Sequence, residues 1–163
     1  MKKIIFISIL AAMQAVAFGQ NNMSNIAILP YDSTNYIRVF KNCKQATLSD
    51  SDYLLIEKLL TQCIAEYNLE QDKYFNEIIN KFPDRNFNRE YFVIDIQQYK
   101  RQYIVVINDK NEKEVWINCF CRTFFRDWRK EIVFVKDGGN CYFNLKINLT
   151  TQKYYDLWVN GEA

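Results

Sequence analysis

Apolar and polar residues alternate with a period of two through the last third of the chain, which is typical of strands with one buried face. The clearest stretch, residues 131–159, predicts a three-stranded antiparallel meander. Gly138 and Gly139 lie between its first two apolar runs, and glycine supplies the positive φ angles of a tight hairpin. A two-residue turn there places Phe134 opposite Phe143.

The same alternation assigns side chains to the two faces of this meander. The predicted core face carries Cys141, Phe143, Leu145, Ile147 and Leu149, and the opposite face carries Tyr142, Asn144, Lys146 and Asn148. For the second turn we expect an odd-length loop with a bulge, because it sets Leu157 rather than Asp156 opposite Ile147.

A helical period of apolar residues follows Ser49, a good N-cap with an acidic residue three positions later. One face of this helix carries Ile56, Leu59, Leu60, Cys63, Ile64 and Tyr67. A weaker repeat predicts a second, short helix over residues 71–82 that stops at Pro83.

The remaining strand signals are shorter. Residues 36–40 predict a strand, and residues 92–96 and 101–107 predict two strands or one broken strand. Residues 108–111 predict a turn, and residues 114–121 predict another strand. In the last of these strands Val115, Ile117, Cys119 and Cys121 share one face. The order therefore indicates an α+β fold in which a curved antiparallel sheet of four to five strands packs on the helix after Ser49. Another two-layer α+β sandwich is the alternative.

The first 19 residues have the pattern of a secretory signal peptide. Lys2 and Lys3 precede an apolar run, and Ala17-Phe18-Gly19 offers small residues for cleavage before Gln20. Ala15-Val16-Ala17, with cleavage before Phe18, is the alternative site. Residues 20–163 then form a single domain that is periplasmic or secreted. The chain has 21 basic and 19 acidic residues, so losing Lys2 and Lys3 leaves 19 of each. This neutrality argues against nucleic-acid binding. The sequence has no second long apolar run, so we expect no stable membrane insertion after cleavage.

Five cysteines in an exported chain could form one or two disulfides, or remain as buried thiols. The sequence does not select a pairing among Cys43, Cys63, Cys119, Cys121 and Cys141. Three of them, in a Cys119-x-Cys121 pair with Cys141, could in principle bind a soft metal, but zinc-ribbon spacings are absent. We predict no metal and no cofactor.

The sequence contains no histidine, which excludes Ser-His and Cys-His catalysis. Gly138-Gly139 lacks the following helix and lysine of a phosphate-binding loop. Carboxylates such as Asp95 and Asp156 remain as conceivable acids and bases, and we assign no catalytic residue.

Two resemblances bear on the class of protein. The order of elements is similar to that of the cystatin and NTF2-like folds. The strings YKRQY (residues 99–103), WINCFC (residues 116–121) and DGGNCYF (residues 137–143) resemble a family of small exported bacterial proteins without assigned activity. Neither resemblance implies a catalytic residue.

The best functional candidate is the sheet face turned away from the helix. It is predicted to present large aromatics among amides and an acid, namely Trp116, Phe120, Tyr142, Asn144, Tyr154, Asp156 and Trp158. Such a face suits capture of a protein, peptide or glycan, or a homodimer interface, unless another segment covers it. We therefore expect a noncatalytic binding or protein-interaction module. The alternative is a small NTF2-like enzyme that uses Asp or Tyr in a pocket between sheet and helix.

Residues 122–130 allow one further hypothesis. Phe124, Phe125 and Trp128 share a helical face opposite four cations, a pattern that suits either a packed connector or a short segment lying on an anionic membrane surface.

Overall fold

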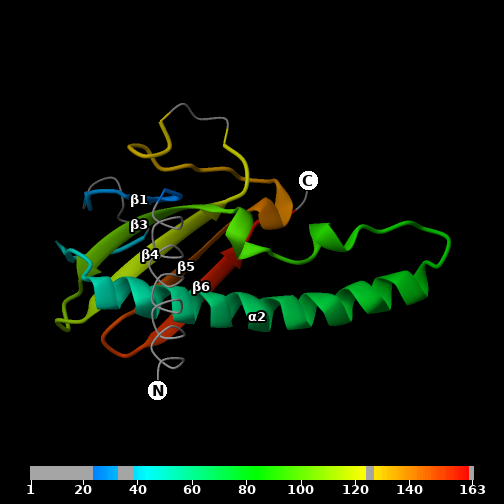
Figure 1. The fold of residues 1–163 in the computed structure, drawn as a ribbon, viewed down its shortest axis with the longest axis horizontal. Coiled ribbons are helices and arrows are strands. Elements are labelled where there is room, and N and C mark those ends of the chain that lie inside the picture. The colour runs from blue at the N-terminus through cyan, green and yellow to red at the C-terminus, as the bar shows by residue number, and fades with distance from the viewer. Residues whose placement is uncertain (1–23, 33–38, 124–126, 162–163) are drawn as a thin grey trace, which may run out of the picture.

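The computed structural model describes residues 24–32, 39–123 and 127–161. One long α-helix packs on one face of a six-stranded mixed sheet, and irregular segments lie on the other face (Figure 1). The α+β class is thus confirmed. The strands are β1 (Ile26–Ile28), β2 (Lys44–Gln45), β3 (Lys100–Ile107), β4 (Lys113–Phe120), β5 (Tyr142–Asn148) and β6 (Lys153–Val159). The expected signal peptide lies outside the described residues. Among the residues that the structure describes, no helix is long and apolar enough to cross a membrane.

The helix α2 (Asp50–Lys81) begins where the sequence predicts. Ser49 and Asp52 form a reciprocal capping box, with each side chain bonded to the backbone N–H of the other residue. The prediction of a separate helix over residues 71–82 is wrong, because α2 runs through this region without a break. No Gly or Pro lies between Ser49 and Phe82, so nothing terminates the helix until the residue before Pro83.

The sheet order is β1-β3-β4-β5-β6, with β2 pairing with the far end of β3. The β3, β4, β5 and β6 strands are antiparallel neighbours, whereas β1 pairs with β3 in parallel. The strand predicted over residues 36–40 falls mostly outside the described residues, and Val39 and Phe40 are not in a strand. Residues 92–96 are also not a strand, because Asn68 bonds both backbone groups of Ile94 in place of a strand partner.

The main core fills the space between α2 and the sheet. Phe143, Leu145, Ile147 and Leu149 face the helix as predicted, as do Val115, Ile117 and Cys119. The interface also contains Arg101, which is almost completely buried and forms an ion pair with Glu57 of α2. The sequence gives no sign of this buried pair, since an arginine in an alternating strand is typical of the exposed face.

The segment 131–137 is where the structure departs most from the predicted meander. It is not a strand, so the hairpin at Gly138-Gly139 and the pairing of Phe134 with Phe143 are both wrong. Phe143 lies opposite Cys119 of β4 instead. The segment crosses above the sheet on the side opposite α2 (Figure 1). Gly138 does adopt a positive φ of 103°, and a Cβ there would lie 2.7 Å from the Tyr142 ring.

Side-chain amides replace the missing strand partners of this segment. Gln102 of β3 is completely buried and donates from Nε2 to the carbonyls of Trp128 and Glu131, at 2.5 and 2.6 Å. Its Oε1 accepts from Val133 N at 2.9 Å and from Asn118 Nδ2 at 3.0 Å. Asn118 Nδ2 also donates to Val133 O at 2.8 Å. The Gln102–Asn118 pair therefore fixes the cover segment, residues 127–137, to the sheet.

The turn between β5 and β6 differs from its prediction in one respect. The loop has four residues, which sets Tyr154 rather than Leu157 opposite Ile147, so the expected odd loop is wrong. The expected bulge is present, but within β6, where Asp156 has a positive φ of 53°. Because the bulge shifts the alternation, Tyr154 and Leu157 both pack on the helix side, whereas Trp158 lies opposite Asn144 on the other face.

The cysteines fall into two groups. Cys121 and Cys141 form a disulfide that closes the chain around the cover segment. This pair is therefore not available to the soft-metal site considered from the sequence, and the described residues contain no cluster suited to a metal ion. Cys63 and Cys119 are buried free thiols, and burial raises the pKa of Cys63 to about 11. Cys43 is a partly exposed free thiol.

Candidate functional site

A notch lies on the sheet face opposite α2, between the cover segment and the end of β6. We call it the Trp158 notch; it has a volume of about 240 Å³. Its lining residues include Trp116, Asn118, Phe134, Tyr142, Asn144, Trp158 and Asn160. Four of the seven residues predicted from the sequence are thus brought together here, namely Trp116, Tyr142, Asn144 and Trp158.

The rim of the notch is formed by two exposed aromatic rings from different parts of the chain. Trp158 of β6 is 67% exposed and Phe134 of the cover segment is 70% exposed. Trp116 and Tyr142 are buried and contribute the interior walls. A large apolar surface with exposed aromatic residues at its rim is typical of contact sites for other molecules.

The polar groups of the notch are oriented by neighbouring side chains. The Trp116 indole N–H donates to Asn144 Oδ1 at 3.1 Å. The Nδ2 group of Asn144 has no hydrogen-bond partner among the described residues. Asn160 Nδ2 donates to the carbonyls of Val135 and Asp137, at 2.7 and 3.2 Å, which fixes the cover segment beside β6. The notch therefore offers one amide donor group in a mainly aromatic setting.

Three predicted site residues lie elsewhere. Phe120 is completely buried beneath the cover segment, where it packs edge-on against Trp128. Tyr154 lies on the helix side and donates its hydroxyl to Glu66, which contradicts its assignment to the opposite face. Asp156 is in the bulge of β6 and pairs with Lys146 at 3.1 Å. The possibility that another segment covers the sheet face is thus realised in part, because the cover segment lies over β4 and the start of β5.

Trp128 also bears on the hypothesis of a membrane-bound segment. Its ring is buried on Phe120, and the guanidinium of Arg129 lies 4.2 Å from the ring centroid. Residues 127–130 form a turn, and Phe124 and Phe125 lie outside the described residues. Trp128 therefore belongs to a packed connector rather than to an inserted aromatic face.

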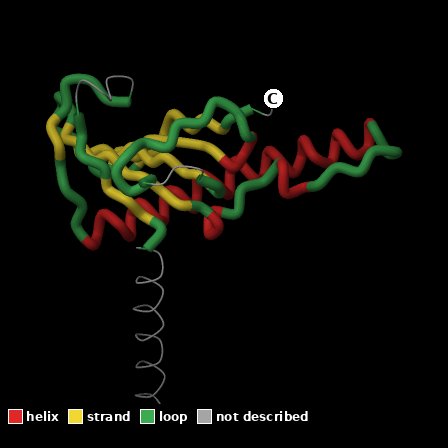
Figure 2. Tube along the Cα trace, turned by 90° about the horizontal axis from the view of Figure 1, so that it is seen from above, coloured by secondary structure: helices red, strands yellow, loops and turns green. Residues whose placement is uncertain are grey.

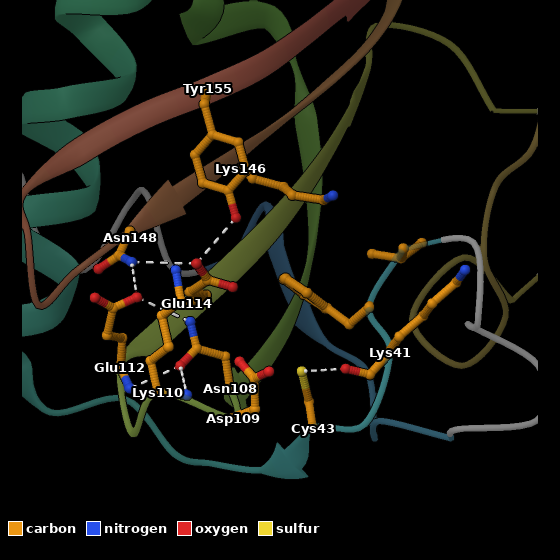
Figure 3. A pocket seen from close by; sticks show the side chains of 12 residues that line it. Lys41, Cys43, Asn108, Asp109, Lys110, Glu112, Glu114, Lys146, Asn148 and Tyr155 are labelled. Atoms are coloured by element: carbon orange, nitrogen blue, oxygen red, sulfur yellow. Dashed lines mark hydrogen bonds between the residues drawn. The ribbon is translucent and has the colours of Figure 1, made fainter.

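A second recess, the end pocket, lies at the other end of the same sheet face, with a volume of about 590 Å³ (Figure 3). It is formed by the turn between β3 and β4, by polar side chains of β4, β5 and β6, and by residues 39–43. Asn148 Nδ2 donates to both Glu112 and Glu114, at 3.0 and 3.1 Å, and the Tyr155 hydroxyl donates to Glu114 at 3.0 Å. No periodic pattern in the sequence indicates this pocket, because its walls combine polar strand residues with loops that lie far apart in the chain.

The electrostatics of the end pocket do not suit proton transfer near neutral pH. Hydrogen bonds from Asn108 and Asn148 lower the pKa of Glu112. Burial, together with the hydrogen bond to Glu114, raises the pKa of Tyr155. Both shifts move the groups away from neutral pH, where a general acid or base works best. Asp95, the other carboxylate considered from the sequence, caps a short 3-10 turn by accepting from Gln97 N at 3.2 Å.

Comparisons with protein-family models, with curated proteins and with solved structures found no match for this chain. The cystatin or NTF2-like relationship therefore stays a prediction.

Proposed function

We propose that the protein is an exported, noncatalytic interaction module that binds a peptide segment of a partner protein in the Trp158 notch. The observation that carries this proposal is the exposure of Trp158 and Phe134 on the two sides of one notch. Aromatic residues at the rim of a pocket are the usual anchors of protein interfaces, because they bury a large area at low entropic cost.

The neighbouring edge of the sheet supports a peptide in particular. β6 is the last strand in the sheet order, so its outer backbone groups have no strand partner among the described residues. The bulge at Asp156 interrupts this edge and leaves a short stretch, residues 157–159, beside the notch. An extended peptide could add to this stretch by main-chain hydrogen bonds and place one apolar side chain in the notch.

Export is supported by two features of different kinds. The first 19 residues have the pattern of a signal peptide. The Cys121–Cys141 disulfide is the kind of bond that persists in oxidising compartments such as the periplasm or the medium.

The alternative of an enzyme with a pocket between sheet and helix receives less support. Buried apolar side chains fill that interface in the described residues. The carboxylates and the tyrosine that come closest to an acid–base arrangement lie in the end pocket, on the other face, with pKa values shifted away from neutral pH.

Peptide display on the purified oxidised protein tests the proposal. Peptides selected on the wild type are titrated against the wild type, Trp158→Ala, Phe134→Ala and Leu54→Ala. Leu54 is a matched control, because it is a 74% exposed apolar residue on α2. We expect Trp158→Ala to weaken binding by about 30-fold, the size of a typical hot-spot effect of 2 kcal/mol. Leu54→Ala should bind as the wild type does.

Two results would contradict the proposal. One is that no selected peptide depends on Trp158, and the other is that Leu54→Ala weakens binding as much as Trp158→Ala. If the wild type forms a concentration-dependent dimer that Trp158→Ala abolishes, then the segment bound in the notch comes from a second copy of the chain.

A further inference from the structure

A third recess lies on the opposite side of the β6 end from the Trp158 notch. We call it the helix groove. It runs between the C-terminal half of α2 and residues 86–94, which we call the return segment, and it has a volume of about 650 Å³. This segment returns along the part of α2 that extends beyond the sheet, as both views show (Figures 1 and 2). The volume is within the range of about 300–1,000 Å³ that small-molecule sites occupy.

The composition of the helix groove is unlike that of the rest of the surface. A quarter of all residues in the chain are charged, yet none of the residues that line the groove is charged. Five aromatic and five carboxamide side chains make up most of the lining. The walls therefore combine flat apolar surfaces with groups that both donate and accept hydrogen bonds.

Hydrogen bonds fix the two walls of the groove in place. Arg89 of the return segment makes two hydrogen bonds with Asp72 of α2, at 2.6 and 2.7 Å. Asn68 bonds both backbone groups of Ile94 at 2.8 Å. Asn140 donates to two carbonyls of the return segment, at 2.8 and 2.6 Å. A groove held in this way is preformed, so a ligand does not have to order its walls.

Several lining groups remain available to a ligand. The rings of Tyr74, on α2, and Tyr91, on the return segment, are 52% and 65% exposed. The amides of Gln71 and Asn86 have no hydrogen-bond partner among the described residues, whereas those of Asn88 and Asn140 are engaged. Burial raises the pKa of Tyr67 further above neutral pH, so its hydroxyl stays protonated and can donate a hydrogen bond.

These features select a class of ligand. Nucleotides, acidic glycans and charged peptides would lose hydration without gaining an opposite charge in the groove. A purely apolar ligand would leave the amides unpaired. Neutral sugars fit both requirements, because their C–H faces pack on aromatic rings and their hydroxyls pair with carboxamides. We propose that the helix groove is a binding site for a neutral oligosaccharide, separate from the peptide site in the Trp158 notch.

Calorimetry with neutral pentasaccharides of glucose, mannose, galactose and N-acetylglucosamine tests this proposal, with Tyr91→Ala, Gln71→Leu and Leu69→Ala as variants. Leu69 is an exposed residue of the same helix that does not line the groove. We expect at least one of the sugars to bind, with a loss of tenfold or more in Tyr91→Ala and Gln71→Leu. Leu69→Ala and Trp158→Ala should bind that sugar as the wild type does.

Two further readouts make the result specific. The side-chain amide signals of Gln71 and Asn86 should shift in nuclear magnetic resonance spectra during the sugar titration. The affinity should not change between low and high salt, because no ion pair forms. The proposal is overturned if none of the neutral sugars binds, or if Tyr91→Ala binds them as well as the wild type. Loss of sugar binding in Trp158→Ala would also overturn it, since the two sites would then be one.

Discussion

Replacing Gln102 with leucine should detach the cover segment from the sheet. Gln102 is completely buried, and its amide bonds the carbonyls of Trp128 and Glu131, the N–H of Val133 and the side chain of Asn118. Leucine has a similar volume, so the substitution removes four hydrogen bonds with little change in packing. The backbone groups of the cover segment would then be buried without partners.

The size of the effect follows from these lost bonds. Each buried polar group left unpaired costs about 1–3 kcal/mol, and three backbone groups lose their partner. The cover segment can lift off and expose these groups to water, which limits the total cost. We therefore expect Gln102→Leu to lower the free energy of unfolding by about 3 kcal/mol. With a urea m-value of about 2 kcal/mol/M, the unfolding midpoint falls by roughly 1.5 M.

Urea unfolding followed by circular dichroism measures the stability. Acrylamide quenching in a Trp158→Phe background, which removes the exposed indole, reports whether the Trp128 ring has become accessible. Gln102→Glu should be at least as destabilising, because a carboxylate cannot donate to the two carbonyls. Gln97→Leu is the control, since Gln97 is exposed and should change stability by less than about 0.5 kcal/mol. A loss below 1 kcal/mol in Gln102→Leu, with Trp128 still protected, would refute the claim that side-chain amides hold the cover segment.

Three other substitutions test separate parts of the structure. Replacing Cys121 and Cys141 with serine should cost about 3 kcal/mol in urea unfolding, because the bond closes a loop with a sequence separation of 20; an unchanged midpoint would show that the bond is not formed. Burial of Asp52 opposes its ionisation, but hydrogen bonds from a lysine of β4 and from the N-cap serine lower its pKa below 3.8. Its contribution is therefore fully present above the unfolded pKa and is lost as the pH falls through the lower folded pKa. Asp52→Asn should cost about 1 kcal/mol at pH 7 and progressively less as the pH falls below 3.8, and a cost that does not change with pH would contradict this. Gly138→Ala should cost about 1–3 kcal/mol, because it combines a positive φ with a clash against Tyr142; a wild-type midpoint would contradict this backbone geometry.

The sequence predicted those elements in which local signals and burial agree. The capping box at Ser49, the apolar face of α2 and the alternation in β4 and β5 all appear in the structure. In each case the apolar period matches the geometry of the element and faces the same core. The prediction of two separate helices in place of α2 is wrong, because a weaker apolar period does not end a helix and no helix-ending residue lies within α2.

The cover segment shows why the rest could not be predicted. Residues 132–135 have the composition of a strand, but Gln102 and Asn118 bond the backbone of Val133, and Asn160 bonds the carbonyl of Val135. The backbone groups of such a segment can bond a neighbouring strand or the side-chain amides of other strands. Tertiary contacts decide between the two, and the apolar–polar alternation of the sequence does not report them. One available signal was the occurrence of Gln102 and Asn118 in strongly apolar strands, where buried amides need partners.

The candidate site was predicted in part for the same reason. Strand alternation brought Trp116, Tyr142, Asn144 and Trp158 to one face, and the structure places them in one notch. The prediction misses Phe134 because it assigns residue 134 to a strand. It misplaces Tyr154 because the loop between β5 and β6 has four residues, which sets Tyr154 opposite Ile147 on the helix side. The end pocket and the helix groove each combine residues of strands or of α2 with loops distant in the chain, and these loops carry no periodic signal.

The accessibility of Trp158 to acrylamide, with and without a selected peptide, tests the central claim most directly. Trp116 and Trp128 are buried, so quenching of the free protein should come from Trp158 and disappear in Trp158→Phe. A peptide bound in the notch should protect the wild type from quenching to the level of that variant. If Trp158→Phe is quenched as strongly as the wild type, or if a bound peptide leaves Trp158 fully accessible, the Trp158 notch is not the binding site.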